Sequence, residues 1–288
     1  MANDLDPFRD AIVAVHPELA GAAFEPLPGG WHSRAVAVDG RLVFKFPRGE
    51  VAERALCREA AILAAVRPHV SMRVPDLRLH EGPPLFSEHV IIPGGHLETA
   101  GYEALAEPAR QALGEAMARF YAELHVLDRT AMEAAGARPV ERWLDAGTIA
   151  ARALPLLPEN LHAFANEVIA GWRSLPPDPY GEIYGFFDGH GWNMAFDAAA
   201  GRLNGIYDFA DSGFGPLHQD FIYSNFISPD LTARIVDGYE RLTRRRLDRA
   251  RIRLLTGVHR LWELAALADA PEHHAAMVDS VAAWAARQ

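Results

Sequence analysis

The feature that most constrains this chain is a pair of glycine-rich segments, 185–196 and 205–213, which carry acidic and amide residues beside apolar stretches. The first reads GFFDGHGWNMAF and places Asp188 and Asn193 five residues apart. The second reads GIYDFADSG and places Asp208 fifteen residues after Asn193. Turns favour Asp, Asn and Gly in any protein, so none of these residues is informative alone. Their order and spacing predict short strands whose ends bring the three polar side chains together.

This arrangement indicates phosphoryl-transfer chemistry, because its spacing is that of a kinase catalytic loop followed by a metal-binding loop. Asp188 would accept or orient the proton of the attacking hydroxyl. Asn193 and Asp208 would hold Mg²⁺, which takes oxygen ligands. Transfer would be direct and in line, since no Cys or His is placed to form a phosphoenzyme.

Far upstream, Lys45 is the only lysine among 28 basic residues and lies at the centre of the apolar run LVFKF. An ammonium group in such a strand is costly unless it meets an anion. Glu59 in the following helical segment could pair with it, and Glu53 is a rival. The alternative is an edge-strand lysine that discourages aggregation. The residue by itself does not decide between the two interpretations.

Hydrophobic patterning predicts a small β-rich lobe, a hinge and a larger helical lobe. In the first lobe, RAVAV and LVFKF predict a hairpin that turns at Asp39–Gly40, and a strand over 85–92 ends at the hinge Pro93–Gly94–Gly95. The remaining elements that we expect are helices over 8–24, 50–66, 102–128, 159–174 and within 216–288, and short strands around 182–187, 193–196 and 203–208.

Composition excludes several classes of protein. The net charge of −10 argues against a nucleic-acid partner. No apolar run is long enough to span a bilayer and no signal peptide begins the chain, so we expect a cytoplasmic protein. Cys57 is the only cysteine, which rules out an internal disulfide, and we expect it in the core. Residues 91–288 hold 18 basic and 26 acidic residues; this acidity would suit a cationic acceptor or simply favour solubility.

Taken together, these segments resemble the aminoglycoside phosphotransferase family, which has a protein-kinase-like fold. FFDGHGWN is similar in spacing to the family's H-G-D-x-x-x-x-N, and DFADSGFGPLHQD, residues 208–220, is similar to its metal segment. PGGWHSRAVAVDGRLVFKFPR resembles its nucleotide loop and lysine strand, and EHVIIPGG its hinge. The resemblance covers roughly residues 20–225, and it is greatest to the 2″-aminoglycoside phosphotransferases.

The resemblance implies an α+β, bilobal fold, with a nucleotide-binding lobe over 1–92 and a helical lobe over 93–288. ATP or GTP would lie between the lobes, with Mg²⁺. Asp220 would support the catalytic loop, and the partners would be a nucleoside triphosphate and a small cationic acceptor. The nucleotide would contact Gly29, Gly30, Ser33, Lys45, Glu59, Glu88, Val90 and Ile91. The acceptor would contact Asp211, Trp262 and Glu263, in part because an aromatic ring and a carboxylate suit a cation.

Several departures from the family pattern leave alternatives open. Phe186 and Phe187 replace the usual His-Gly before the catalytic aspartate, Ala210 replaces a glycine and Pro216 an aspartate. The Phe186–Phe187 pair allows a nucleotide-binding pseudokinase, although the retained Asp188, Asn193 and Asp208 argue for catalysis. A kinase of an amino-alcohol, amino-acid or sugar metabolite would use the same site. The sequence leaves open the choice of ATP or GTP, the oligomeric state and any role in antibiotic resistance.

One basic segment, 241–253, contains seven arginines. Such a cluster could bind nucleic acid or phosphate. Leu242, Leu247 and Ile252 interleave with the arginines at helical spacing, however, so we interpret the segment as a solvated face of a helix.

Overall fold

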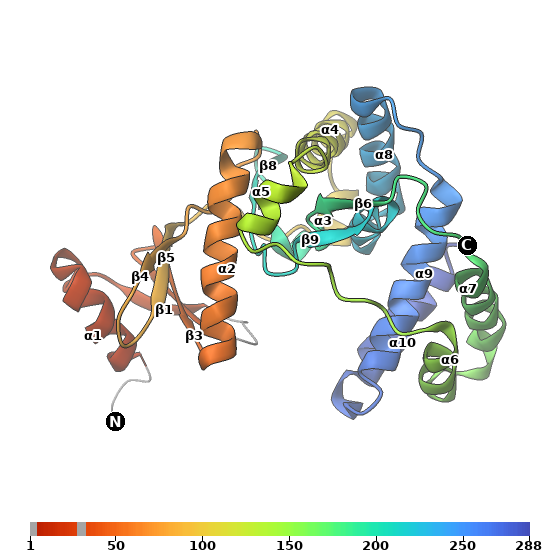
Figure 1. The fold of residues 1–288 in the computed structure, drawn as a ribbon, viewed down its shortest axis with the longest axis horizontal. Coiled ribbons are helices and arrows are strands. Elements are labelled where there is room, and N and C mark those ends of the chain that lie inside the picture. The colour runs from red at the N-terminus through yellow and green to blue at the C-terminus, as the bar shows by residue number, and fades with distance from the viewer. Residues whose placement is uncertain (1–4, 28–32) are drawn as a thin grey trace.

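The computed structural model describes residues 5–27 and 33–288, which form a small lobe on an antiparallel sheet and a larger, mainly helical lobe (Figure 1). This α+β arrangement confirms the predicted fold class. The elements of the small lobe are α1 (Asp6–Val15), β1 (Phe24–Leu27), β2 (Ser33–Val38), β3 (Leu42–Pro47), α2 (Glu50–Val66), β4 (Arg78–His80) and β5 (Phe86–Val90).

The sheet of the small lobe has the strand order β1-β2-β3-β5-β4, and its pairings are antiparallel. The predicted hairpin is confirmed: β2 and β3 pair from Ser33↔Pro47 to Val38↔Leu42. Asp39 and Gly40 both have positive φ, at 51° and 60°. Two consecutive left-handed residues make the tight turn whose twist matches that of paired strands.

The two faces of this sheet are covered differently. Side chains alternate along a strand, so Phe44 and Phe46 of β3 point to one face and Lys45 to the other. On the phenylalanine face, α1 contributes Ile12 to a small apolar core with Phe44, Phe46 and Phe86. On the lysine face lies α2, which Figure 1 shows between the sheet and the helical lobe. The sheet therefore has an outer face toward α1 and an inner face toward the rest of the molecule.

The larger lobe surrounds two short hairpin-like strand pairs. Its helices are α3 (Thr99–Glu103), α4 (Glu107–Leu124), α5 (Arg129–Ala134), α6 (Ala146–Ala153), α7 (His162–Ser174), α8 (Pro229–Thr243), α9 (Arg249–Ala266) and α10 (Pro271–Ala285). Its strands are β6 (Glu182–Gly185), β7 (Met194–Asp197), β8 (Arg202–Ile206) and β9 (Gly213–Pro216), paired as β6–β9 and β7–β8. Short 3₁₀ turns cover Pro17–Leu19, Arg67–His69, Leu154–Leu156, Glu159–Leu161, Gly191–Asn193, Leu217–Phe221 and Tyr223–Phe226.

Two apolar cores stabilise this lobe. The larger one lies between α4, α8 and the short strands and contains Met117, Phe120, Phe186 and Phe209. The second joins α6, α7, α9 and α10, at the end of the molecule away from the sheet (Figure 1). Helices α4 and α8 approach closely because Gly238 faces Ala118, where an added Cβ would lie 2.6 Å from the alanine Cβ.

Several predicted boundaries were wrong for physical reasons. The expected helix over 102–128 is two helices, α3 and α4, because Pro108 fits the first turn of the second helix but could not continue the first. The region 8–24 ends in a 3₁₀ turn that leads into β1, and the helix expected from 159 starts only at His162. Strand β9 was not anticipated, since its GFGP sequence lacks the usual strand formers. Cys57 is exposed, because it lies beside the buried stripe of α2.

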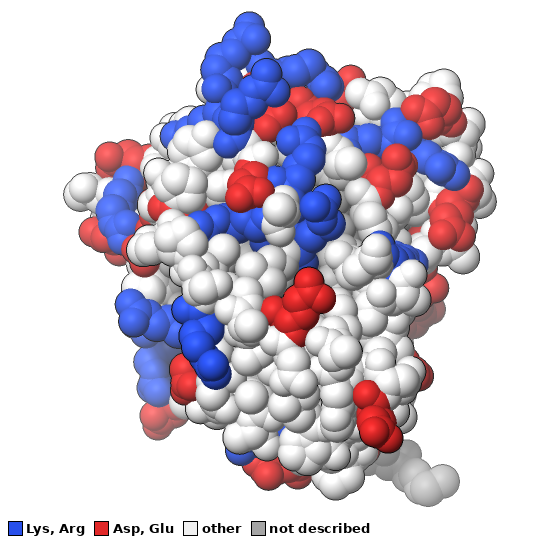
Figure 2. Space-filling view, turned by 90° about the vertical axis from the view of Figure 1, so that its right-hand side faces the viewer, with Lys and Arg blue, Asp and Glu red and all other residues white. Residues whose placement is uncertain are grey.

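The surface of the larger lobe mixes both signs of charge. On the face it turns away from the sheet, basic and acidic side chains are interspersed above and uncharged atoms predominate below (Figure 2). The excess acidity of residues 91–288 therefore does not form a uniform negative surface over this end. Within the described residues, every helix is too short or too polar to cross a membrane.

Candidate active site

The site begins at the ion pair between Lys45 and Glu59 in the small lobe, where Glu59 also contacts the larger lobe. The Lys45 ammonium lies 3.6 Å from Glu59 Oε1, and the backbone N–H of Phe209 donates to the same oxygen at 3.4 Å. Burial alone would lower the pKa of Lys45, but the charges of Glu59 and Asp208 outweigh it and raise that pKa. The raised pKa keeps Lys45 charged. Its acidic partner in the structure is Glu59, and not Glu53.

The catalytic-loop candidates come together as the spacing predicted. Asn193 Nδ2 donates to Asp188 Oδ2 at 2.6 Å and to its backbone oxygen at 3.0 Å. His190 Nε2 lies 2.9 Å from the other carboxylate oxygen, Oδ1. Burial would lower the pKa of His190, yet the hydrogen bond and charge of Asp188 raise it overall. Both oxygens of Asp188 are therefore held from within one six-residue loop.

A buried carboxylate supports that loop from below. Asp220 accepts hydrogen bonds from the backbone N–H groups of Phe186 at 3.1 Å and Phe187 at 2.5 Å. Its Oδ2 also lies 2.9 Å from His125 Nε2, and His125 Nδ1 lies 2.9 Å from the Tyr239 hydroxyl. Because these contacts use backbone groups of the loop, they do not depend on which side chains precede Asp188. This is the supporting position expected for Asp220.

The substitution of Phe186 for a histidine is absorbed by the core. Phe186 is inaccessible to solvent and packs against Phe209 and Phe120, with ring centroids 4.9 and 5.8 Å away. Phe209 follows Asp208, whose φ of 67° lies in the left-handed region. The apolar ring at 186 thus packs against the residue after Asp208, while the Asp188 carboxylate contacts Asn193 and His190.

Three acidic residues, Asp208, Asp211 and Glu141, concentrate negative charge around Asp188. The pKa of Asp211 is raised to about 6, first by partial burial and then by repulsion from Asp188, Asp208 and Glu141. Mutual repulsion of carboxylates is relieved when a divalent cation binds among them. Asp208 and the amide oxygen of Asn193 are oxygen donors of the kind that Mg²⁺ prefers, so these residues fit the predicted metal ion.

The predicted hinge is hydrogen-bonded to the strands β7 and β8 of the larger lobe. Gly95 and Phe196 exchange both backbone hydrogen bonds, at 2.9 and 2.8 Å, and Asn204 Nδ2 donates to the Pro93 oxygen. Gly94 has a φ of 143°, and an added Cβ there would lie 2.4 Å from the backbone carbon of Ala195. Only glycine allows this approach, so the hinge lies directly on β7, which follows Asn193.

Not every predicted nucleotide contact lies near Lys45. Gly29 and Gly30 fall outside the described residues, and Ser33 begins β2 opposite Pro47. In β5, Glu88 pairs with Phe44 while Ser87 pairs with Lys45, so the Glu88 side chain lies on the outer face of the sheet. The structure does not bring it to Lys45. Val90 is exposed at the strand end, and the Ile91 N–H is used by the Arg41 oxygen at 2.8 Å.

The residues of β5 that face Lys45 are Ser87 and His89, which the sequence did not single out. Ser87 is fully buried. Burial, and secondarily the charge of Lys45, lowers the pKa of His89 to about 4, so this imidazole is neutral. Alternation along the strand could have identified both residues, once Lys45 had been placed on the inner face.

Trp262 lies in a group of aromatic side chains near Asp188, and Glu263 contacts one member of that group. We call Trp143, Tyr223, His259 and Trp262 the aromatic wall. His259 contacts the other three rings at centroid distances of 5.2 to 5.4 Å, and Trp143 stacks on Trp262 at 6.2 Å. Glu263 Oε2 lies 3.4 Å from His259 Nδ1. Tyr223 is near enough to Asp188 for that charge to contribute to its raised pKa, after burial.

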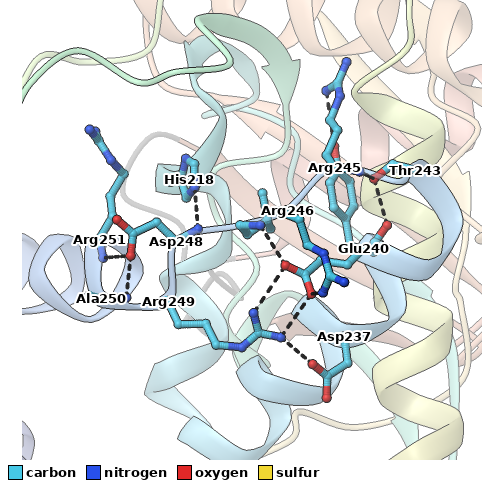
Figure 3. A network of polar contacts seen from close by, with 12 residues as sticks. His218, Asp237, Glu240, Thr243, Arg245, Arg246, Asp248, Arg249, Ala250 and Arg251 are labelled. Carbon is cyan, nitrogen blue, oxygen red and sulfur yellow. Dashed lines mark hydrogen bonds and ion pairs between the residues drawn. The ribbon is translucent and has the colours of Figure 1, made fainter.

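The arginine-rich segment proved to be a turn rather than one helical face. Helix α8 ends at Thr243 and α9 starts at Arg249, and several arginines around this turn contact neighbouring groups of the same lobe (Figure 3). Arg249 contacts Asp237 and, at 3.3 Å, both oxygens of Glu240. Arg251 is buried and donates to the oxygens of Pro176 and Pro177. These bonds stabilise the turn between the two helices, and they leave those arginines engaged.

A second polar chain in Figure 3 fixes the start of α9. His218 Nε2 accepts from the backbone N–H of Asp248 at 3.0 Å, as Figure 3 shows. On its other side, His218 Nδ1 lies 2.8 Å from Asp178 Oδ2. Both side chains of the Asp178–His218 pair are nearly inaccessible, at 2% and 1%. The helix that carries His259 and Trp262 is thereby anchored to the segment between β9 and Asp220.

Comparison with known proteins gives a consistent result. A family model described as "Phosphotransferase enzyme family" matches residues 23–255. No curated protein matches the chain by sequence. Wild-type aminoglycoside 2′-phosphotransferase IIIa in its GDP complex superposes with a TM-score of 0.81 at 18% identity, over 99% of each chain. The GDP and kanamycin complex of APH(2″)-IIIa gives 0.80 at 18% identity, over 98% of this chain and 99% of that one.

The similarity extends to enzymes of another substrate class. Macrolide 2′-phosphotransferase MphH from Brachybacterium faecium superposes with a TM-score of 0.70 at 17% identity, over 94% of this chain and 98% of that one. At such identities the solved structures establish the shared fold, and the acceptor has to be argued from the side chains of this site.

Proposed function

Because this chain belongs to the phosphotransferase enzyme family, we propose that it moves the γ-phosphoryl group of ATP or GTP to a hydroxyl of an aminoglycoside-like, cationic acceptor. Family membership makes it a small-molecule phosphotransferase that acts on alcohol groups. The proposal adds the acceptor class and the roles of individual residues. The nucleotide would lie between the lobe over 1–92 and the lobe over 93–288.

The observation that carries the proposed chemistry is the shared contact of Glu59. One carboxylate oxygen meets both the Lys45 ammonium and the backbone N–H that follows Asp208. The phosphate-binding lysine of the small lobe and the cation-binding aspartate of the large lobe are thus joined through one side chain. Phosphoryl transfer depends on this kind of positioning more than on covalent chemistry.

Each residue of the site has one task in this scheme. Lys45 binds nucleotide phosphate oxygens, and Asp188 orients the acceptor hydroxyl and receives its proton as the oxygen attacks. His190 and Asn193 hold the Asp188 carboxylate in place through its two oxygens. Asp208 and Asn193 would hold Mg²⁺, which when bound supplies positive charge to the phosphate oxygens.

The acceptor class rests on the aromatic wall and its acidic surroundings. Amino groups are attracted to carboxylates and to the faces of Trp and Tyr rings. Asp211, Glu141 and Glu263 provide the carboxylates, and Trp143 with Trp262 provides the apolar face. An amine-bearing sugar fits this combination.

The aromatic wall also favours a second candidate acceptor of larger apolar surface. Macrolide-like molecules carry an amino sugar on an apolar ring, and the stacked Trp143–Trp262 pair would contact such a ring. The small acceptor of a metabolite kinase would contact less of this apolar surface. The pseudokinase alternative is weakened, because Phe186 and Phe187 keep their backbone bonds to Asp220 and leave Asp188 fully supported.

A direct test is nucleotide consumption by purified protein with Mg²⁺. ATP and GTP would be assayed separately against aminoglycosides, macrolides, amino alcohols, amino acids and sugars. We expect turnover with aminoglycosides that disappears in Asp188→Ala. Turnover with macrolides alone would favour the second candidate. Nucleotide binding without turnover on any acceptor would contradict the proposal and favour the pseudokinase.

A further inference from the structure

The outer face of the N-terminal sheet carries a cluster of two histidines and a glutamate that the phosphotransfer chemistry does not use. His16 ends α1, His80 ends β4 and Glu88 lies in β5. His16 Nε2 and His80 Nε2 lie 2.5 and 3.2 Å from the same oxygen, Glu88 Oε2. All three atoms are within 4.8 Å of one another. From this convergence we propose that the cluster binds one Zn²⁺ ion.

The three atoms need a positive charge among them. His16 Nδ1 lies 3.1 Å from Glu18 Oε1, and as a donor it leaves a lone pair on Nε2 when the ring is neutral. That lone pair would face the carboxylate oxygen of Glu88 at 2.5 Å, which is repulsive. His16 Nε2, His80 Nε2 and Glu88 Oε2 are all buried and make no directed hydrogen bond. A cation bound by all three atoms removes the repulsion and satisfies each of them.

The ligand chemistry selects a borderline transition metal. Two imidazoles and one carboxylate form a set that zinc uses, whereas Mg²⁺ prefers oxygen ligands alone. With metal–ligand bonds of about 2.0–2.2 Å, the ligands of a tetrahedral site lie about 3.3–3.6 Å apart. The two contacts to Glu88 Oε2, at 2.5 and 3.2 Å, are shorter than this value, so the side chains would move slightly apart to admit the ion. Water would take the fourth position.

The neighbouring side chains orient the ligands as in established metal sites. Glu18 accepts from the remote nitrogen of His16, and Arg78 Nη1 lies 3.2 Å from the other oxygen of Glu88. A second partner of this kind fixes the tautomer of a ligating histidine and the direction of a carboxylate. The histidine side chains retain 19% and 16% exposure, which gives an ion access from solvent.

The proposed site is separate from the phosphotransfer site. Glu88 and Lys45 point to opposite faces of the same sheet, as their pairing with Phe44 and Ser87 requires. A zinc ion would join the end of α1 to β4 and β5, and it would take no part in phosphoryl transfer. Loss of the zinc site would therefore leave the proposed function standing, and the reverse also holds.

The test is zinc binding by full-length protein freed of any affinity tag and of metal. Isothermal titration calorimetry with ZnCl₂, together with elemental analysis, should give one equivalent of zinc per chain. Zinc should also raise the midpoint of thermal unfolding, because it binds the folded state. Affinity should fall at lower pH, since protons compete for the imidazoles.

Matched variants identify the ligands. His80→Ala and the shape-preserving Glu88→Gln should each weaken zinc binding by more than about tenfold, and Glu18→Gln by about tenfold or less. His69→Ala is the control. His69 is exposed in the 3₁₀ turn Arg67–His69 and is not one of the three ligands, so this variant should bind zinc like the wild type. The proposal is overturned if the wild type binds no zinc, or if both His80→Ala and Glu88→Gln bind it unchanged.

Discussion

The two halves of the candidate site are built in different ways. We call Lys45, Glu59, Asp188, Asn193 and Asp208 the transfer cluster. Directed hydrogen bonds and an ion pair position the first four of these residues, and two of the bonds use backbone atoms, those of Asp188 and Phe209. The aromatic wall is positioned by ring contacts between residues of three separate segments. Directed bonds fix positions within tenths of an ångström, whereas ring contacts tolerate other side chains of similar size. The reaction is thereby constrained more tightly than the acceptor.

The sharpest way to separate the halves is to remove the base alone. Asp188→Ala should lower kcat by about 10²–10⁴-fold, because a positioned general base contributes that much. Nucleotide affinity should stay within about twofold, since Lys45 and Glu59 are untouched. Single-turnover kinetics and nucleotide titration measure the two quantities. Asp279→Ala, an exposed carboxylate on α10, is the control. Normal turnover by Asp188→Ala would refute the assigned role.

The support beneath the transfer cluster gives the next largest effect. Asp220→Asn replaces a buried acceptor of two backbone N–H groups and should lower the free energy of unfolding by about 1–3 kcal/mol. It should reduce kcat as well, because the loop that carries Asp188 loses an anchor. Urea unfolding and steady-state kinetics would be compared with Tyr239→Phe, which removes only the far end of the same chain. An unchanged kcat in Asp220→Asn would show that the loop holds its own shape.

A change in the aromatic wall should affect binding of the acceptor, whereas the changes in the transfer cluster and its support affect kcat. Trp262→Ala should raise the KM for the acceptor by about two- to tenfold, the effect expected for one aromatic stacking partner. The KM for nucleotide should not change. Trp192→Ala removes an exposed tryptophan of the catalytic loop instead, and it is the matched comparison. If Trp262→Ala altered nucleotide KM as much as acceptor KM, the two halves would not be independent.

The smallest effect concerns the pair that anchors α9. Burial would raise the pKa of Asp178, but hydrogen bonds from His218 and Tyr180 outweigh it and lower that pKa. The stabilisation is therefore complete above the ordinary aspartate pKa and is lost as the pH falls through the lowered value. Asp178→Asn should cost about 1 kcal/mol near neutral pH. That difference should shrink in acid, as urea unfolding at about pH 7 and pH 3 would show. A difference independent of pH would contradict the assignment.

The sequence predicted the transfer cluster better than the aromatic wall for the same structural reason. Asp188, Asn193 and Asp208 lie within 21 residues of one another, and their spacing reflects one pair of loops. The lobed α+β fold was also accessible from hydrophobic patterns, and the resemblance of residues 208–220 to the family's metal segment indicated Asp220. His190 lies inside the same motif, two residues after Asp188, and could have been identified there.

The remaining features depend on tertiary structure. Trp143 lies in an irregular segment between α5 and α6, and no local pattern relates it to Trp262 on α9. Strand β9 forms because β6 offers it a partner, not because GFGP favours a strand. Glu88 was expected at the nucleotide, yet the register of β5 turns it to the outer face. In each case the deciding contact joins residues that are far apart in the chain.

The hydrogen bonds between the hinge and β7 determine how the two lobes can move relative to each other. The backbone N–H and C=O groups of Gly95 are both hydrogen-bonded to Phe196 of β7. The Arg73 oxygen accepts a hydrogen bond from the Ile206 N–H of β8. A rotation between the lobes must therefore pivot near β7 and β8, with the hinge moving as part of the larger lobe. Points on the small lobe would travel in proportion to their distance from this pivot. The outer strands β1 and β2 would swing widely, while Asn193, next to the axis, would hardly move.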